Sequence, residues 1–174
     1  MHIIYICLLS VNRYLRHMAD QGTADQDGQR RDLAAMLQPL LRSLVAAELP
    51  VLARHGVSMW GYVVLNALDG RPARTQAALA TAIGADKTRI IATLDELQEA
   101  GLIARERDPA DRRARLLSIT AAGRRTRQAA QAEIQANENR VLARLPAADR
   151  QAFLRAVRAL SALPASEVTG LEDH

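Results

Sequence analysis

Arginine side chains are concentrated in one short stretch of the chain, and their chemistry suggests a first hypothesis about function. Between Gly101 and Thr120 the sequence contains Arg105, Arg107, Arg112, Arg113 and Arg115. A guanidinium group is permanently charged and donates hydrogen bonds to two oxygens at once, which suits phosphate groups and the acceptor edge of guanine. The cluster therefore predicts contact with a polyanion.

The distribution of charge supports the same partner. The chain of 174 residues has 23 Lys and Arg against 19 Asp and Glu, a net charge of +4. Residues 71–125 contain 11 of the basic and 7 of the acidic residues, which leaves 12 of each in the rest of the chain. The whole excess of positive charge thus falls in one third of the sequence, and such localisation favours a nucleic acid.

The arginine-rich stretch has the pattern of a β-hairpin. Apolar and polar residues alternate in Leu102–Arg107 and in Ala114–Ile119, and a polar tip that includes Pro109 separates the two segments. This spacing predicts two antiparallel strands joined by a longer loop rather than by a two-residue turn. Thr120 then begins a further helix.

Two short helices are predicted immediately before the hairpin. Thr75 caps the first, Gln76 to Ala82, and Gly84 provides a sharp turn. Asp86 caps the second helix, whose inward residues we expect to be Ile90, Ile91, Leu94 and Leu97, and Gly101 ends it. A helix-turn-helix followed by a basic hairpin is a winged helix, an arrangement that holds duplex DNA.

Several polar side chains are the candidates for contacting DNA. The second helix is expected to present Lys87, Thr88, Arg89 and Thr93 outward near its N-terminal end, where a recognition helix meets bases and phosphates. An ordinary solvated helix face is the alternative. The complete predicted DNA-binding set is Thr75, Gln76, Lys87, Thr88, Arg89, Thr93, Arg105, Arg112, Arg113 and Arg115.

The segments outside this unit are expected to be helices that pair two chains. From about Gln29, apolar residues recur at i, i+3, i+4 and i+7, the period of an amphipathic helix, and Pro39 should kink it or shift its start. Pro50 is expected to begin a short turn that ends at Gly56. Ser58 should cap the next helix, Met59 to Ala67.

Two further helices are predicted after the hairpin. A long one is predicted over Ala121–Leu145, and a last one after Pro146 that buries Phe153, Leu154, Val157 and Leu160. The terminal helices contain more apolar surface than one small domain needs, and a symmetric homodimer would bury it.

These residues together resemble the MarR family of transcriptional regulators over about residues 29–163. The most specific part is the segment from Asp108 to Gly123, Asp-Pro-Ala-Asp-Arg-Arg-Ala-Arg-Leu-Leu-Ser-Ile-Thr-Ala-Ala-Gly, which is similar to the family's wing signature. The resemblance implies a homodimer that binds a palindromic double-stranded DNA operator. It also implies that Arg113 enters the minor groove, and that Asp111 pairs with a nearby arginine to stiffen the wing loop.

The resemblance further implies a small-molecule effector. Many relatives release DNA when an aromatic or phenolic molecule binds between the dimer helices and the winged helix, so His55, Met59, Trp60 and Tyr62 are the candidate ligand-binding residues. The alternative is that the Met and Trp are ordinary core residues. Some relatives sense peroxide through a cysteine in the first long helix, but Cys7, the only cysteine, precedes that helix.

Other classes of function find little support in the sequence. The four histidines are scattered, and with one cysteine they provide no metal-binding spacing, so we predict no metal, no cofactor and no enzymatic activity. Residues 71–125 contain no aromatic residue on which a single-stranded nucleic acid could stack. The remaining alternative is a dimeric winged-helix module that binds a protein partner without reading DNA.

The predicted fold class is mainly α with a small β-hairpin wing, a winged helix-turn-helix between N- and C-terminal dimerisation helices. Residues 1–28 form an N-terminal arm, 29–57 the N-terminal dimerisation region, 58–120 the DNA-binding domain, 121–163 the C-terminal dimerisation helices and 164–174 a tail.

The beginning of the chain raises two further expectations. Residues 1–17 differ in composition from the rest of the chain, and we hypothesise that the natural start is Met18; an extra helix is the alternative. The apolar run at residues 3–9 is too short to span a membrane, and a signal peptide is the alternative reading of this run. The single cysteine fits a reducing compartment. We therefore expect a cytoplasmic protein with no membrane partner.

Overall fold

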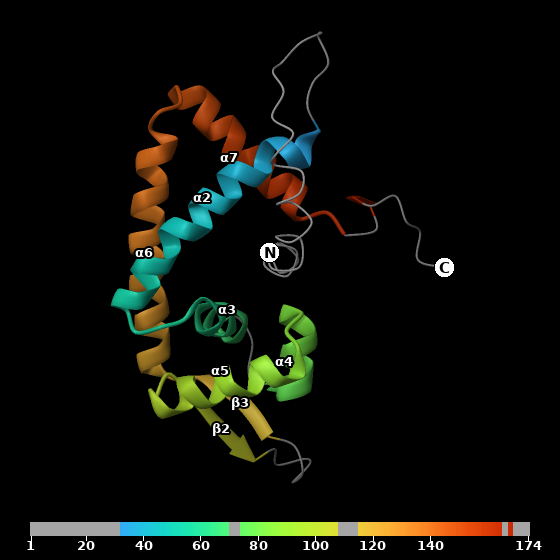
Figure 1. Cartoon of the computed structure of the whole chain (residues 1–174), viewed down its shortest axis with the longest axis vertical. Helices are drawn as coiled ribbons and strands as arrows, with labels where there is room; N and C mark the ends of the chain where they lie inside the picture. Colours follow the sequence, from blue (N-terminus) through green and yellow to red (C-terminus); the bar gives the residue numbers. More distant parts are fainter. Residues whose placement is uncertain (1–31, 70–73, 108–114, 165–166, 169–174) are drawn as a thin grey trace. The chain divides into compact units, whose positions relative to one another are not determined.

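The computed structural model describes residues 32–69, 74–107, 115–164 and 167–168. The chain divides into two compact units, with the boundary inside a helix, between residues 135 and 136. Figure 1 shows the elements in chain order. They are α2 (Leu33–Arg54), α3 (Met59–Leu68), β1 (Arg74–Thr75), α4 (Gln76–Ile83), α5 (Lys87–Glu99), β2 (Ile103–Arg107), β3 (Arg115–Ile119), α6 (Ala121–Leu142) and α7 (Ala147–Ser161). The described part of the chain is therefore mainly helical, as predicted.

Helix α2 is one continuous helix that contains both Pro39 and Pro50. The prediction that Pro50 begins a separate turn is wrong. Each proline deprives the carbonyl four residues earlier of a donor, but those residues, Ala35 and Ala46, are exposed. Water can satisfy carbonyls on an exposed face, so the helix tolerates the prolines.

Most of the apolar surface of α2 is uncovered. Only Val51 and Leu52 are buried, whereas Leu33, Met36, Leu37 and Leu40 are each at least 38% exposed. Among the described residues, α2 is also the helix long and apolar enough to cross a membrane, with a mean hydropathy of 1.3 over the relevant window. Length and composition alone give this result, and an amphipathic interface helix meets the same criteria.

Helix α3 lies at the centre of the hydrophobic core. Its N-terminus is capped as predicted, because the Ser58 hydroxyl accepts a hydrogen bond from the Gly61 N–H at 3.0 Å. Val64 and Leu65 have no exposed surface. Tyr62 and Leu68 are the other buried apolar side chains of α3. The residues of other segments in the same core are Val51, Leu52, Val57, Leu79, Ile83, Ile90, Leu94, Leu97, Leu102, Ile103, Leu117, Ile119, Ala130 and Ile134.

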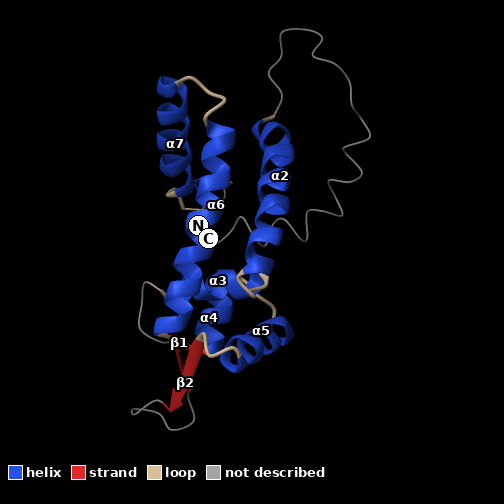
Figure 2. Ribbon diagram, turned by 90° about the vertical axis from the view of Figure 1, so that its left-hand side faces the viewer, coloured by secondary structure: helices blue, strands red, loops and turns tan. Residues whose placement is uncertain are grey.

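The sheet has three strands in the order β1-β3-β2. Strands β2 and β3 form the predicted antiparallel hairpin, with Ile103 opposite Ile119. The short strand β1 pairs with β3 on its other side, and the sequence analysis missed it because two residues carry no period-2 pattern. Figure 2 shows β2 directed away from the helices α3, α4 and α5.

The second unit contains α7 and the end of α6. We expected α7 to bury four apolar residues, but none of its residues is buried. Phe153 and Leu154 are half-buried, while Val157 and Leu160 are 41% and 56% exposed. The apolar stripe was identified correctly, but no residue of α7 is buried among the described parts of the chain.

Candidate nucleic-acid interface

The predicted helix-turn-helix is formed by α4 and α5. The Thr75 hydroxyl accepts a hydrogen bond from the Ala78 N–H at 3.3 Å, which caps the N-terminus of α4. Gly84 ends the helix in the left-handed conformation with φ 59°, a geometry that residues with a Cβ adopt only at a cost. This turn sends the chain directly into α5, so α4 and α5 pack together over α3.

One of the four residues on the buried face of α5 differs from the prediction. Ile90, Leu94 and Leu97 are buried as expected, but Ile91 is 43% exposed and Thr93 only 6% exposed. Positions 90, 93, 94 and 97 follow the i, i+3, i+4, i+7 pattern, so Thr93 falls inside the stripe and Ile91 outside it. The prediction that Thr93 faces outward to contact DNA is therefore wrong.

The N-terminal turn of α5 is where the remaining recognition-helix candidates lie. Lys87, Thr88 and Arg89 have helical backbone there, and their side chains are outside the described part of the structure. Asp86 immediately precedes them and is exposed. The DNA-binding roles of these three residues remain predictions.

The stem of the wing, residues 103–107 and 115–119, brings together two arginines. Arg107 lies directly opposite Arg115 in the register of β2 and β3, and both residues are exposed. We did not include Arg107 in the predicted DNA-binding set. Pairing the two β-branched residues near the base of the hairpin, Ile103 with Ile119, places the two arginines opposite each other. Like charges at directly opposed positions destabilise a sheet, which makes this pair a favourable place for an anion.

Arg105, also a predicted DNA contact, is engaged within the protein. Its guanidinium forms an ion pair with Asp95 of α5, with an Nη2–Oδ1 distance of 2.5 Å, and 22% of its side chain is exposed. The Nε atom of Arg105 is covered and has no hydrogen-bond partner. Residues 108–114, which include Asp111, Arg112 and Arg113, lie outside the described residues. Their predicted roles therefore remain predictions.

The base of the wing is tied to the start of α6 by backbone and hydroxyl groups. The Thr120 hydroxyl donates to the Gly101 carbonyl at 2.8 Å and accepts from the Gly123 N–H at 3.0 Å. The Thr120 N–H donates to the Leu102 carbonyl at 3.0 Å. Gly123 is buried, and a Cβ there would lie 2.0 Å from the Leu102 oxygen. The strand-to-helix junction therefore requires a residue without a side chain.

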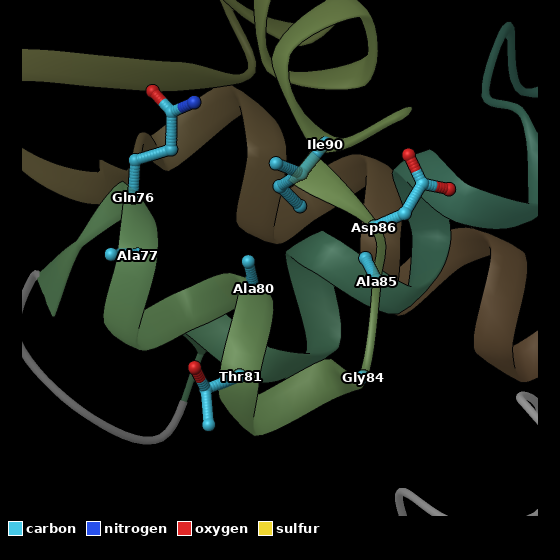
Figure 3. Close-up of a pocket in the computed structure, with 8 residues that line it drawn as sticks. All are labelled: Gln76, Ala77, Ala80, Thr81, Gly84, Ala85, Asp86 and Ile90. Atoms are coloured by element: carbon cyan, nitrogen blue, oxygen red, sulfur yellow. The ribbon is translucent and has the colours of Figure 1, made fainter. Parts of the chain in front are cut away.

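An open hollow lies between α4 and α5, with a volume of about 820 Å³. Figure 3 shows Gln76 and Asp86 at its two sides, with Ala80 and Ile90 between them. The predicted DNA contact Gln76 thus borders a depression in the reading head. None of the four predicted ligand-binding residues lines this hollow.

The predicted ligand-binding residues are divided between the core and a polar cluster. Tyr62 is buried, and Met59 and Trp60 are half-buried against the core. His55 lies 3.1 Å from Glu133 of α6, Nε2 to Oε2, and 24% of its side chain is exposed.

Glu133 is the centre of that polar cluster. It also forms an ion pair with Arg54. The hydrogen bond from Arg54 is the main reason that the pKa of Glu133 is held below its usual value of 4.5, and the bond with His55 acts in the same direction. Glu133 is therefore ionised at neutral pH, beside an imidazole that borders the predicted ligand region.

A second ion pair joins α3 to α6. The Arg127 guanidinium contacts Asp69 at 2.7 Å, Nη2 to Oδ2, and 12% of the Arg127 side chain is exposed. It also donates to the side chains of Asn66 at 3.3 Å and Gln131 at 2.9 Å. This contact holds the first part of α6 against the winged helix. Within the described residues no cluster of His, Cys, Asp and Glu could hold a metal ion.

Comparison with known proteins identifies the family. The model for the MarR family matches residues 55–114, which include α3, α4, α5 and β2. The HTH-type transcriptional repressor Rv2887 of Mycobacterium tuberculosis is 31% identical over 121 residues, which cover 70% of this chain and 85% of the relative. Rv2887 has been solved as a MarR-family protein. The chain belongs to the MarR family.

Solved structures of MarR-family members show the same fold. The repressor CouR bound to a 23-mer DNA duplex is 30% identical, with a TM-score of 0.62, over 75% of this chain and 92% of that one. Rv2887 in complex with p-aminosalicylic acid has a TM-score of 0.65 at 26% identity, over 76% of this chain and all of that one. The predicted winged-helix fold is thereby confirmed.

One curated relative matches over a smaller part of its length. The putative transcriptional regulatory protein for the hcr operon of Thauera aromatica is 32% identical over 94 residues. The match covers 54% of this chain and 52% of that protein.

Membership of the MarR family makes this chain a DNA-binding transcriptional regulator rather than an enzyme.

Proposed function

We propose that this MarR-family regulator represses transcription as a cytoplasmic homodimer that binds a palindromic DNA operator and releases it when a small aromatic ligand binds. The observation that carries the proposal is the pairing of the α4–α5 reading head with an arginine-bearing hairpin, in a chain 30% identical to a repressor solved on a DNA duplex. Specific binding needs contacts to base edges and contacts to the phosphate backbone. The α4–α5 reading head supplies the first and the hairpin supplies the second.

The DNA contacts are assigned to three places on the winged helix. Thr75 and Gln76 at the start of α4 and Lys87, Thr88 and Arg89 at the start of α5 approach the major groove. Arg115 on the stem of the wing meets a phosphate. Arg112 and Arg113 at its tip reach the minor groove, where a narrow A·T-rich segment attracts a guanidinium. Asp111 pairs with an arginine and stiffens the tip.

Dimerisation is supported by apolar surface that is exposed in the described part of the chain. The exposed face of α2 and the exposed stripe of α7 each consist of large aliphatic residues. Such residues are costly to leave in water, at roughly 25 cal/mol per Å² of apolar surface. A twofold partner covers them and sets the distance between the two reading heads, which makes the operator palindromic.

The effector is a small aromatic or phenolic molecule that binds near His55, Met59, Trp60 and Tyr62. Support comes from relatives, since CouR of Rhodococcus jostii RHA1 has been solved with p-coumaroyl-CoA and Rv2887 with p-aminosalicylic acid. In this chain the half-buried Trp60 and Met59 offer an apolar surface, and His55 offers a polar group at its edge. Aromatic ligands favour this combination.

The test is to sequence DNA fragments that the purified protein retains from its own genome, with and without p-aminosalicylic acid and p-coumaroyl-CoA. We expect a palindromic sequence to be enriched, and the enrichment to fall when an effector is present. Arg113→Ala should weaken binding to that sequence by about 5- to 150-fold, equivalent to about 1–3 kcal/mol, while the protein stays folded and dimeric. Unchanged affinity for this variant would show that the wing assignment is wrong.

The second candidate, a winged-helix module that binds a protein partner, predicts a different result in a gel-shift assay. A module that binds only a protein partner would give no retarded band with the DNA upstream of its own coding sequence at moderate salt. The exposed and opposed Arg107 and Arg115 favour the DNA-binding function, because a polyanion relieves their mutual repulsion.

A further inference from the structure

The guanidinium group of Arg105, one of the wing arginines, is engaged within the protein, whereas a DNA contact requires its N–H donors to be accessible. Its guanidinium is held by Asp95 at 2.5 Å, Nη2 to Oδ1, and its Nε is covered. A phosphate contact needs the fork of N–H donors to face solvent. In Arg105, with 22% of the side chain exposed, Nη2 is engaged by Asp95 and Nε is covered.

The Arg105–Asp95 ion pair connects the wing with α5. Helix α5 and strand β2 are already joined by the short connection at residues 100–102. The Arg105–Asp95 ion pair is a second attachment, from the middle of β2 to the middle of α5. The base of the hairpin is also held by the core, because Ile103 and Ile119 are buried there together with Leu94 and Leu97. The ion pair adds a restraint further along β2, beyond the last buried residue of that strand.

The angle between the wing and α5 matters because the two contact different parts of the DNA. In the proposed function, α5 enters the major groove and the wing tip enters the minor groove, so the two must be spaced to match the duplex. An ion pair that fixes their angle prepares both contacts before DNA binds, and less conformational entropy is then lost on binding.

We propose that Arg105 is a positioning residue that, through Asp95, sets the angle of the wing to α5, and that the phosphate contact of the wing stem is made by Arg107 and Arg115. This assignment rests on the proposed function. Strand alternation places Ile103, Arg105 and Arg107 on one side of β2. Along that side burial decreases from the base to the tip: Ile103 is buried, Arg105 is half-buried and Arg107 is exposed.

The charge of Asp95 makes the proposal easy to test. Asp95 is 58% exposed on the recognition helix, so by charge alone its removal should favour binding to a polyanion. The positioning role predicts the opposite, because neutralising Asp95 releases Arg105 and with it the wing. The two accounts therefore predict opposite changes in DNA affinity when Asp95 is neutralised.

The experiment measures operator affinity over a range of salt for the full-length protein. Asp95→Asn and Arg105→Gln should each weaken binding by about fivefold, the upper range for an exposed ion pair. The double variant should be no weaker than the weaker single variant, and the exchange Asp95→Arg with Arg105→Asp should restore affinity. Glu96→Gln, the same charge change at the next and also exposed residue, should leave binding unchanged or slightly tighter.

Salt dependence separates positioning from direct contact. Each lost phosphate contact lowers the slope of log affinity against log salt by about 0.9. Arg107→Gln should therefore lower the slope by about 1.8 in a dimer, whereas Asp95→Asn and Arg105→Gln should leave it unchanged. Urea unfolding of each variant establishes that it is folded at the assay temperature.

Four results would overturn the proposal. Tighter binding by Asp95→Asn, or a reduced salt slope for Arg105→Gln, would make Arg105 a phosphate contact. Failure of the wild-type protein to bind any operator would instead count against the proposed function, and the positioning role would fall with it. A wild-type protein that binds, with an Asp95→Asn variant that binds equally well, would remove the positioning role alone.

Discussion

At the scale of single residues, the junction between the wing and α6 depends on the absence of one side chain. Gly123 is packed so closely that a Cβ would lie 2.0 Å from the Leu102 oxygen and 2.9 Å from Ile119 Cγ1. Backbone and core must shift to accept it, so Gly123→Ala should lower the free energy of unfolding by about 3 kcal/mol or more. The midpoint of urea unfolding measures this loss. Gly56→Ala is the control, since Gly56 has φ 66° but open space around it, and should cost about 1 kcal/mol. Equal losses for both variants would contradict the packing argument.

Sequence patterns also predicted the surroundings of some single side chains incorrectly. Ile91 and Thr93 exchanged their expected positions on α5, because an apolar residue next to the stripe resembles a member of it until neighbouring elements determine the rotation of the helix. Arg105 was correctly recognised as part of a basic strand, but its partner Asp95 is ten residues away on another element. The pairing depends on how α5 and β2 lie against each other, which no local pattern contains.

At the scale of elements, the helices begin where capping residues predict. Ser58 caps α3, the helix at the centre of the core, through its bond with the Gly61 N–H. Ser58→Ala should lower the free energy of unfolding by about 1 kcal/mol, because a backbone donor loses its partner. Thermal unfolding with calorimetry measures the change, and Ser58→Asp, which retains an acceptor, should remain within a few tenths of a kcal/mol of the wild type. A loss of the same size in both variants would show that the hydrogen bond is not the cause.

The strands of the wing were predicted to within a residue, because their alternation of apolar and polar residues is a local pattern. The two-residue strand β1 was not predicted, because it forms only by pairing with β3. Helix α2 was also predicted incorrectly near Pro50. Sequence preference alone indicates that a proline interrupts a helix, but the cost depends on whether the carbonyl that loses its donor is exposed to water.

At the scale of the whole molecule, the uncovered apolar face of α2 predicts association of two chains. Sedimentation equilibrium should give the mass of a dimer, and Leu37→Glu should shift the protein towards monomer by placing a charge in the interface. Ala46→Glu is the matched control, because it lies nine residues further along the helix, on the opposite side, and is exposed. A monomeric wild type would contradict the dimer. Wild-type protein that floats with lipid vesicles would instead show that this face binds a membrane.

Local sequence patterns were enough to predict most of the helices, the two strands of the wing, and the concentration of positive charge in a winged helix-turn-helix. These properties depend on local periodicity, capping and composition, and each can be recognised within about ten residues. The three-dimensional packing was needed to show which face of α5 is buried, that Arg105 is paired with Asp95, that Arg107 lies opposite Arg115, and that several large apolar residues of α2 and α7 are exposed. Those properties depend on contacts between residues far apart in the chain, and such contacts are chosen by the packing of whole elements rather than by any one segment.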